Sequence, residues 1–168
     1  SAYDERGFIE FFNDFFKFKT QRFYIINNNQ NNFIRAWHAH KKESKIFYSL
    51  NGFIQISAVK IDNFKKPSKN LIINNFFLSD KSSKLLYIPG GYANGIKFFN
   101  SNDRVLVFSS SKLNESIKDD YRYAFDFWDP WNVNFKYMIN KKILILGGNG
   151  MLGKDMINAF MNHGFKNI

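Results

Sequence analysis

The hydrophobic positions of the chain form short runs separated by polar residues from Phe8 to Trp128. The runs are rich in aromatic and β-branched residues, and Asn, Gly, Ser, Asp or Lys-Pro lie between them. This pattern predicts strands at FIEFF, RFYII, NFIRAWHAH, KIFYSL, FIQISAVKI, LIINNFFL, KLLYIP, GIKFF and RVLVFSS. The Asn51-Gly52 pair favours a type I′ hairpin. With no helix longer than a turn or two expected before residue 150, the pattern predicts an all-β sandwich or barrel.

The pattern changes near the C-terminus, where KKILILGGNGMLGKDMINAFMNHG predicts a strand, a glycine loop and an amphipathic helix. The loop resembles the phosphate-binding start of the extended short-chain dehydrogenases, with glycines at Gly147, Gly150 and Gly153. The chain ends before the acidic residue that would bind a ribose about 20 residues further on. We therefore expect a first domain at 1–137 and a truncated β-α fragment of a Rossmann domain at 138–168. NAD(P) is implied only for the missing remainder of that second domain.

Composition narrows the range of partners. The net charge of +10 comes from scattered Lys and Arg residues without a basic block, so no nucleic-acid partner is expected. Two explanations of this charge remain open: a coding bias of the genome, and an anionic small-molecule partner such as a nucleotide diphosphate. The absence of cysteine excludes disulfides, thiolate metal sites and a cysteine nucleophile. No apolar run reaches the ~18 residues of a membrane span, so we expect a soluble, cytoplasmic protein.

Two histidines stand close together in RAWHAHKKESK. Alternate residues of a strand point to the same face, so His38 and His40 are expected to project side by side. They could be metal ligands, a catalytic base with a helper, or part of a solvated face. In the metal-binding pattern of cupin barrels a Glu and a third His follow such a pair, but Glu43 is too close and Asn94 stands at the third position. No metal site is therefore expected.

Four segments resemble the nucleotide-sugar cupins of the dTDP-4-dehydrorhamnose 3,5-epimerase superfamily. They are YDERGFIEFF, IRAWHAHKKESK, LSDKSSKLLYIPGGYANGIKFF and VFSSSKLNESIKDDYRYAFDFW, which together cover about residues 3 to 130. The resemblance implies a cupin-type jelly-roll barrel that binds a nucleotide-diphosphate sugar and needs no cofactor. It also implies a homodimer and a role in surface polysaccharide biosynthesis.

The same resemblance assigns roles to particular residues. A 4-keto group acidifies the neighbouring C3 and C5 hydrogens, so a base removes one of them while a cation stabilises the enolate. The resemblance makes His38 the base, with Lys45 as the cation and His40 as a further catalytic residue. The substrate-binding residues that it implies are Arg6, Tyr24, Arg35, Tyr92 and Asn94.

Some helper residues of the epimerases are replaced in this chain. Phe108 matches their acidic Tyr, Asn94 replaces a second His, and NFKYMINKK replaces the segment that carries their Asp. The HAHK stretch is similar to that of the sugar 3,4-ketoisomerases, and His40, Tyr24 and Tyr92 are candidates for the lost acid. The charged stretch ESIKDDYRY is expected to lie near the substrate or in a dimer contact.

The expected function is that of an isomerase of a nucleotide-linked 4-keto-6-deoxy sugar, similar to a 3,5-epimerase. One alternative is a sugar 3,4-ketoisomerase. The other is a non-catalytic sugar-nucleotide binding module that assists an attached reductase.

Overall fold

The computed structural model describes residues 2–12 and 18–132. The glycine motif at 147–153 and the predicted domain at 138–168 lie outside the described residues. The elements are β1 (Ala2–Asp4), β2 (Gly7–Ile9), β3 (Arg22–Asn27), β4 (Phe33–His40), β5 (Lys45–Asn51), β6 (Phe53–Lys60), β7 (Ile73–Ser79), β8 (Leu86–Ile88), β9 (Tyr92–Phe98), β10 (Arg104–Ser109), α1 (Leu113–Lys118) and β11 (Tyr121–Arg122).

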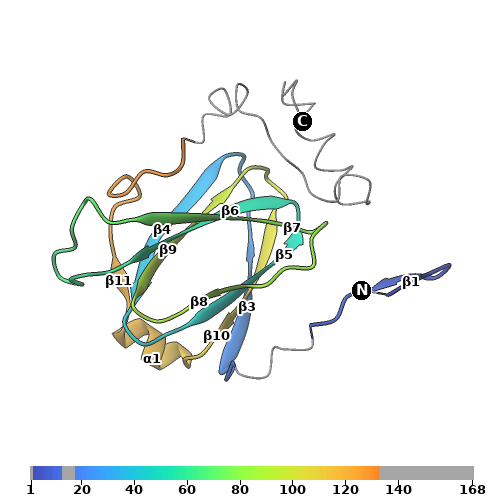
Figure 1. The fold of residues 1–168 in the computed structure, drawn as a ribbon, viewed down its shortest axis with the longest axis horizontal. Coiled ribbons are helices and arrows are strands. Elements are labelled where there is room, and N and C mark those ends of the chain that lie inside the picture. Colours follow the sequence, from blue (N-terminus) through green and yellow to red (C-terminus); the bar gives the residue numbers. More distant parts are fainter. Residues whose placement is uncertain (1, 13–17, 133–168) are drawn as a thin grey trace. The chain divides into compact units, whose positions relative to one another are not determined.

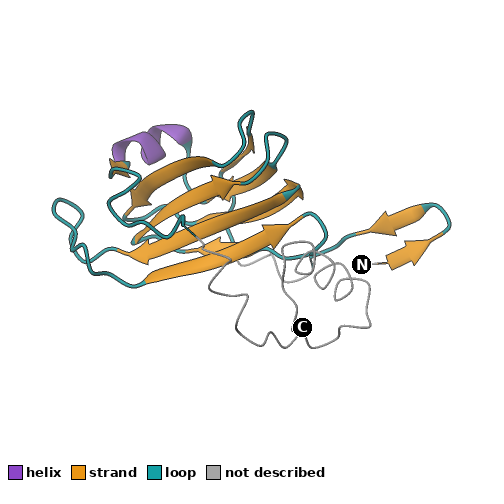
Figure 2. Cartoon of the chain, turned by 90° about the horizontal axis from the view of Figure 1, so that it is seen from above, coloured by secondary structure: helices purple, strands orange, loops and turns teal. Residues whose placement is uncertain are grey.

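The strands form two main antiparallel sheets and one small hairpin. The larger sheet has the order β11-β4-β9-β6-β7, the smaller has the order β3-β10-β5-β8, and β1 pairs with β2. Figure 1 shows the two main sheets along opposite sides of the barrel. Figure 2 shows the helix α1 at one end of the strands. The prediction of an all-β fold is confirmed for the described residues.

Side-chain alternation in both sheets creates the core between them. Buried residues on the facing sides include Phe47, Ile56, Phe98 and Val107. The other face of β4 is covered by the segment after α1, because the Trp37 indole packs edge-on against Trp128 and donates to backbone oxygens of that segment. Trp37 and Ala39 therefore point outward, which leaves His38 and His40 on the inner face, as the period of two predicts.

The predicted hairpin forms between β5 and β6, but its turn is not of type I′. Such a turn needs a positive φ at both central residues. Gly52 has a φ of +82°, whereas Asn32 is the only non-glycine residue of the described chain with a positive φ. The prediction for Asn51 is therefore wrong, and its amide instead donates to the backbone oxygen of Asn102 at 2.8 Å. The neighbouring loop determines this turn.

Strand boundaries follow the sequence pattern in the barrel and depart from it at the ends. β3 to β8 and β10 lie on predicted runs, and β9 begins earlier than expected, at Tyr92. The run FIEFF contributes only to the short β2, and β1 and β11 were not predicted. β11 lies in a charged stretch without alternation and pairs with β4 at His38 and Ala39. Its partner, and not its own pattern, makes it a strand.

Candidate functional site

Charged and polar side chains gather at one end of the barrel interior, and we call this group the polar cluster. In the smaller sheet Ser109 pairs with both Arg22 and Lys45, so these residues form one row. In the larger sheet His38 pairs with Asn94, and His40 pairs with Tyr92. The turn after β4 and the segment after α1 complete the group. The polar cluster consists of Arg22, His38, His40, Glu43, Lys45, Ser109 and Asp120.

His40 is buried, with both ring nitrogens occupied. Its Nδ1 lies 2.9 Å from the backbone oxygen of Asp119, and its Nε2 lies 3.0 Å from Nζ of Lys45. Because a carbonyl only accepts, Nδ1 carries the hydrogen, and the Nε2 lone pair accepts from the Lys45 ammonium. Burial lowers the pKa of His40, and the charge of Lys45 lowers it further. His40 is therefore a neutral ring that holds Lys45.

His38 is the accessible member of the pair, since 36% of its side chain is exposed. Burial, followed by the charges of Arg122 and Lys45, lowers the pKa of His38 to about 4. Its Nδ1 lies 4.0 Å from Oδ1 of Asp120. That oxygen is buried and accepts no hydrogen bond within the described chain, while the other carboxylate oxygen pairs with Arg122 at 2.7 Å. The arrangement is a half-buried, neutral base with a carboxylate nearby.

Behind the histidines lies a buried carboxylate. Oε1 of Glu43 accepts from Nη2 of Arg22 at 3.2 Å and from Oγ of Ser109 at 2.7 Å, and Nζ of Lys45 is 3.9 Å away. Burial raises the pKa of Glu43, but Lys45 and hydroxyl donors outweigh it, so that the pKa is lowered. Burial lowers the pKa of Lys45, and Glu43 opposes that effect. The charges of this cluster therefore depend on one another.

A β-bulge places Arg35 on the inner face together with His38. Residues three apart point to opposite faces of a regular strand, but the register between β4 and β9 shifts between Arg35 and His38. Arg35 consequently pairs with the inward-facing Ile96. Its guanidinium lies 5.4 Å from the ring centre of Phe33 and the residue is exposed. It borders the polar cluster rather than joining it.

Three further predicted residues line the interior near the polar cluster. Tyr24 lies under the guanidinium of Arg22, and burial, followed by Glu43, raises its pKa to about 12. Tyr92 is partly buried and packs against the core beside His40. Asn94 is buried and donates from Nδ2 to the backbone oxygen of His38 at 3.0 Å. Asn94 thus fixes the strand that carries the base.

Two sequence matches look different in three dimensions. Arg6 is 84% exposed at the turn between β1 and β2, where it pairs with Asp4, so the structure does not bring it to the polar cluster. Phe108 packs against Phe23, which is 66% exposed, and so faces away from the interior. The inward residue at this end of β10 is Ser109. Phe108, which matches the acidic Tyr of the epimerases in sequence, therefore does not face the polar cluster.

Sequence reasoning missed several members of the polar cluster. The sequence pattern suggests Glu43 only as a candidate metal ligand and Asp120 only as part of a charged stretch. The acidic doublet in KDDYRY was the available signal for Asp120, and the alternation of Glu43 and Lys45 was the signal for the buried pair. Nothing in the sequence brought Arg22 or Ser109 to attention.

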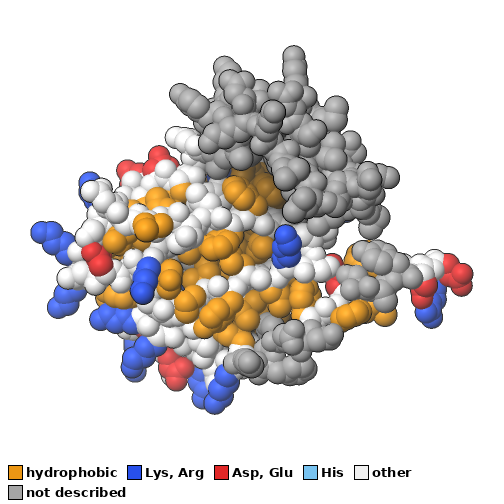
Figure 3. Space-filling view, viewed as in Figure 1, with side chains coloured by type: hydrophobic (Ala, Val, Ile, Leu, Met, Phe, Trp, Pro, Cys, Tyr) orange, Lys and Arg blue, Asp and Glu red, His pale blue; other side chains and the backbone are white. Residues whose placement is uncertain are grey.

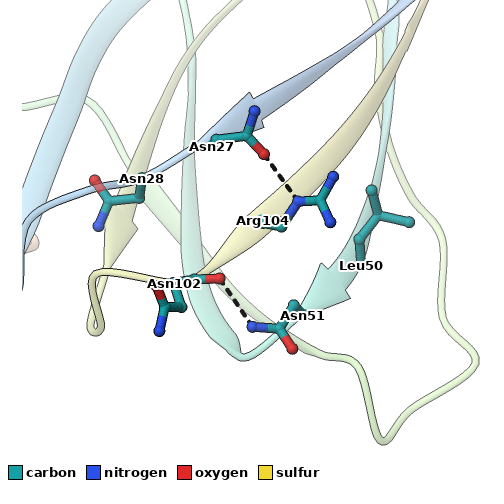
Figure 4. A pocket seen from close by; sticks show the side chains of 6 residues that line it. All are labelled: Asn27, Asn28, Leu50, Asn51, Asn102 and Arg104. Atoms are coloured by element: carbon teal, nitrogen blue, oxygen red, sulfur yellow. Dashed lines mark hydrogen bonds between the residues drawn. The ribbon is translucent and has the colours of Figure 1, made fainter.

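The described residues also include a pocket and surface charges outside the polar cluster. A shallow pocket lined by Asn27, Asn28, Leu50, Asn51, Asn102 and Arg104 is shown in Figure 4. It lies at the opposite end of β3, β5 and β10 from the polar cluster. Among the described residues, no group of three or more His, Asp or Glu side chains is arranged to hold a metal ion. Figure 3 shows Lys and Arg side chains spread singly over one face, without a basic block.

Comparisons with known proteins relate this geometry to a family. A family model described as FdtA: WxcM-like, C-terminal matches residues 1–128. The search of curated proteins found no match. No helix in the described part of the chain is long and apolar enough to cross a membrane.

Several solved structures share the fold. QdtA, a sugar 3,4-ketoisomerase from Thermoanaerobacterium thermosaccharolyticum in complex with TDP, is 24% identical, with a TM-score of 0.58 and coverage of 80% of this chain and 90% of that one. The dTDP-4-dehydrorhamnose 3,5-epimerase of Bacillus anthracis, with TDP and PPi bound, is 18% identical, with a TM-score of 0.64 and coverage of 78% and 80%. WlaRA, a TDP-fucose-3,4-ketoisomerase from Campylobacter jejuni, is 23% identical, with a TM-score of 0.51 and coverage of 66% and 73%. The predicted cupin-type jelly-roll barrel is confirmed.

Proposed function

Because the chain belongs to the family described as FdtA: WxcM-like, C-terminal, we propose that it is an isomerase of a nucleotide-linked 4-keto-6-deoxy sugar. The observation that carries the proposal is His38, a half-buried imidazole that lies beside a buried, charged cluster and whose pKa is lowered to about 4. The solved structures with this fold include both epimerases and ketoisomerases that bear TDP. A dTDP-linked sugar is therefore the first substrate to test.

His38 acts as the base in this proposal. A neutral imidazole accepts the proton next to the ketone, and the resulting imidazolium is stabilised by the carboxylate of Asp120, 4.0 Å from Nδ1. Asp120 is also fixed by Arg122, so it keeps its place as the charge on His38 changes. This carboxylate fills the role of the family Asp that the sequence comparison could not find.

The negative charge that develops on the ketone oxygen needs a nearby cation. Lys45 is almost wholly buried, with 8% of its side chain exposed, and its ammonium donates to His40. A charge at this depth is poorly screened by water and acts on the enolate through the low-dielectric interior. Arg35 on the same face, together with Tyr92, borders the space where sugar and diphosphate would lie. Arg6, Tyr24 and Asn94 remain proposed substrate-binding positions.

The direction of the β10 side chains favours the ketoisomerase as the second candidate. A 3,5-epimerase returns the proton to the face of the ring opposite the base. β10 presents Val107 and Ser109 to the interior, and Phe108 faces outward. β10 itself therefore presents no tyrosine at the strand end where the resemblance puts the acid, and the tyrosine that lines the interior there is Tyr24 of the neighbouring β3. A 3,4-ketoisomerase moves a proton from C3 to C4, and one base that lies beside both carbons can remove the proton and return it.

Proton exchange with solvent tests the proposal directly. The protein is incubated in heavy water with dTDP-4-keto-6-deoxyglucose and followed by NMR. Deuterium at C3 and C5 with the ketone still at C4 identifies an epimerase. Deuterium at C4 with the ketone moved to C3 identifies a ketoisomerase. Binding without any exchange would refute both and leave the sugar-nucleotide binding module.

The outer face of the smaller sheet supports a homodimer, the assembly that we also propose. Phe23, Ile25 and Tyr87 are exposed there, and so large an apolar surface on one sheet is typical of an interface. Sedimentation should give twice the monomer mass for the wild-type protein, and the Phe23→Lys variant should sediment with a lower mass. A monomer at micromolar concentration would contradict the assembly without affecting the proposed reaction. We further propose a cytoplasmic role in surface polysaccharide synthesis.

A further inference from the structure

The buried carboxylate of Glu43 is not explained by contact with a substrate. Its side chain is fully buried in the turn between β4 and β5, and its polar neighbours come from β3, β4, β5 and β10. Burying a charge is costly unless partners offset it. Here the single carboxylate of Glu43 lies between two cations, Arg22 and Lys45, so its one negative charge faces two positive charges. The carboxylate is therefore in a position to control the protonation of its neighbours.

Lys45 and His40 form a pair joined by one hydrogen bond. The proton between Nζ and Nε2 can belong to Lys45, which leaves a neutral imidazole, or to His40, which leaves a neutral amine. In both states Nδ1 of His40 keeps its hydrogen, because it donates to the backbone oxygen of Asp119. Nearby charges decide which state is populated. The groups facing the pair are Arg22 on β3, His38 on β4, Glu43 on the turn, and Asp120 and Arg122 near β11.

The two carboxylate oxygens of Glu43 have different neighbours in the polar cluster. Its Oε1 is engaged by Arg22 at 3.2 Å and Ser109 at 2.7 Å, whereas Nζ of Lys45 lies 3.9 Å away, beyond hydrogen-bonding distance. The carboxylate therefore attracts the ammonium without accepting its hydrogen bond. The ammonium donates to His40 at 3.0 Å instead. Oε2 of Glu43 lies 3.4 Å from Nδ1 of His40. The carboxylate therefore lies near both members of the pair, with Oε1 toward Lys45 and Oε2 toward His40.

We propose that Glu43 is a positioning residue that keeps Lys45 as an ammonium ion directed at Nε2 of His40, and that Arg22 limits its effect. The relevance to catalysis rests on the proposed function, because the retained positive charge would stabilise the enolate formed at His38. The electrostatic claim itself needs no substrate. Removing the negative charge of Glu43 favours the neutral amine, and removing the positive charge of Arg22 favours the ammonium.

The two substitutions should therefore move the Lys45 pKa in opposite directions. Charges within about 4–6 Å typically shift a pKa by roughly 1–3 pH units. Glu43→Gln should lower the pKa of Lys45 by about that amount, and Arg22→Gln should raise it. Glu43→Asp retains the charge and should stay near the wild-type value. Asp126→Asn, at an exposed site, serves as the matched control and should leave the pKa unchanged.

The measurement is an NMR titration of the full chain carrying [13C]lysine at Cε, without nucleotide sugar. The Lys45 signal is identified by its loss in Lys45→Gln, and circular dichroism checks that each variant folds. A Lys45 pKa that stays constant or rises in Glu43→Gln, or that moves the same way in both variants, would overturn the proposal. If Glu43→Gln does not fold, Arg22→Gln must still raise the pKa. Because no turnover is measured, failure of the proposed reaction would leave this result intact.

Discussion

Replacement of His38 by Asn is expected to abolish proton exchange while leaving the fold and nucleotide binding almost unchanged. The imidazole is partly exposed, and its Nδ1 is 4.0 Å from Asp120, too far for a hydrogen bond. The substitution therefore removes no side-chain hydrogen bond to residues 2–12 or 18–132. Replacing a half-buried side chain without breaking a hydrogen bond should lower the free energy of unfolding by no more than about 1 kcal/mol. For a chain of this size the melting temperature should fall by no more than about 4 °C.

The loss in turnover follows from the charge state of the base. With its pKa lowered to about 4, His38 is unprotonated at pH 7 in all but roughly one molecule in a thousand. The whole population of wild-type enzyme can thus accept a proton, and the variant can accept none at this position. General bases typically contribute about 10²–10⁴-fold to the rate. That range corresponds to roughly 2.7–5.5 kcal/mol of transition-state stabilisation.

The assay combines deuterium exchange, kcat and TDP affinity for wild type, His38→Asn and Arg104→Gln. Arg104 lies at the opposite end of β10 and serves as the control whose activity should not change. The expected result is a fall in kcat for His38→Asn with a nearly constant Kd for TDP. A residual kcat within a few-fold of wild type, in a folded protein that binds TDP, would refute the assignment of His38 as the base.

Three further results are expected. His40→Gln should retain more turnover and stability than His40→Asn, because the Gln carbonyl can accept the hydrogen bond from Lys45. His40→Asn should lose about 1–3 kcal/mol of unfolding free energy in urea. Equal turnover and stability of the two variants would contradict the role of this hydrogen bond. The acid limb of kcat/KM should fall near pH 4 rather than near 6.5, since a lowered His38 pKa keeps the base unprotonated until that pH. A limb near 6.5 would contradict the lowering of the His38 pKa. Gly52→Ala should destabilise the fold more than Gly91→Ala. Both glycines have a positive φ, but only at position 52 would a new Cβ lie against a buried carboxylate, that of Asp103, 2.0 Å away. Equal urea midpoints of the two variants would be inconsistent with that clash.

The outcome at the two histidines shows how far strand periodicity can be used. Alternation alone put His38 and His40 on one face, and the structure agrees because a strand has a fixed period of two. The same rule would place Arg35 on the opposite face. Only the bulge between β4 and β9 brings it to the inner face. A bulge depends on how two strands pair, so the sequence of one strand does not reveal it.

The all-β class and most strand positions follow from local hydrophobic alternation, and the proposal of His38 as the base follows from a family motif of a few residues. The tertiary structure decided what surrounds that base. Glu43, Ser109 and Asp120 are up to 77 positions apart in the chain, and only strand pairing and the segment after α1 bring them together. It also decided which histidine is exposed and which is buried, since burial and pKa depend on neighbours from distant segments and not on residue type.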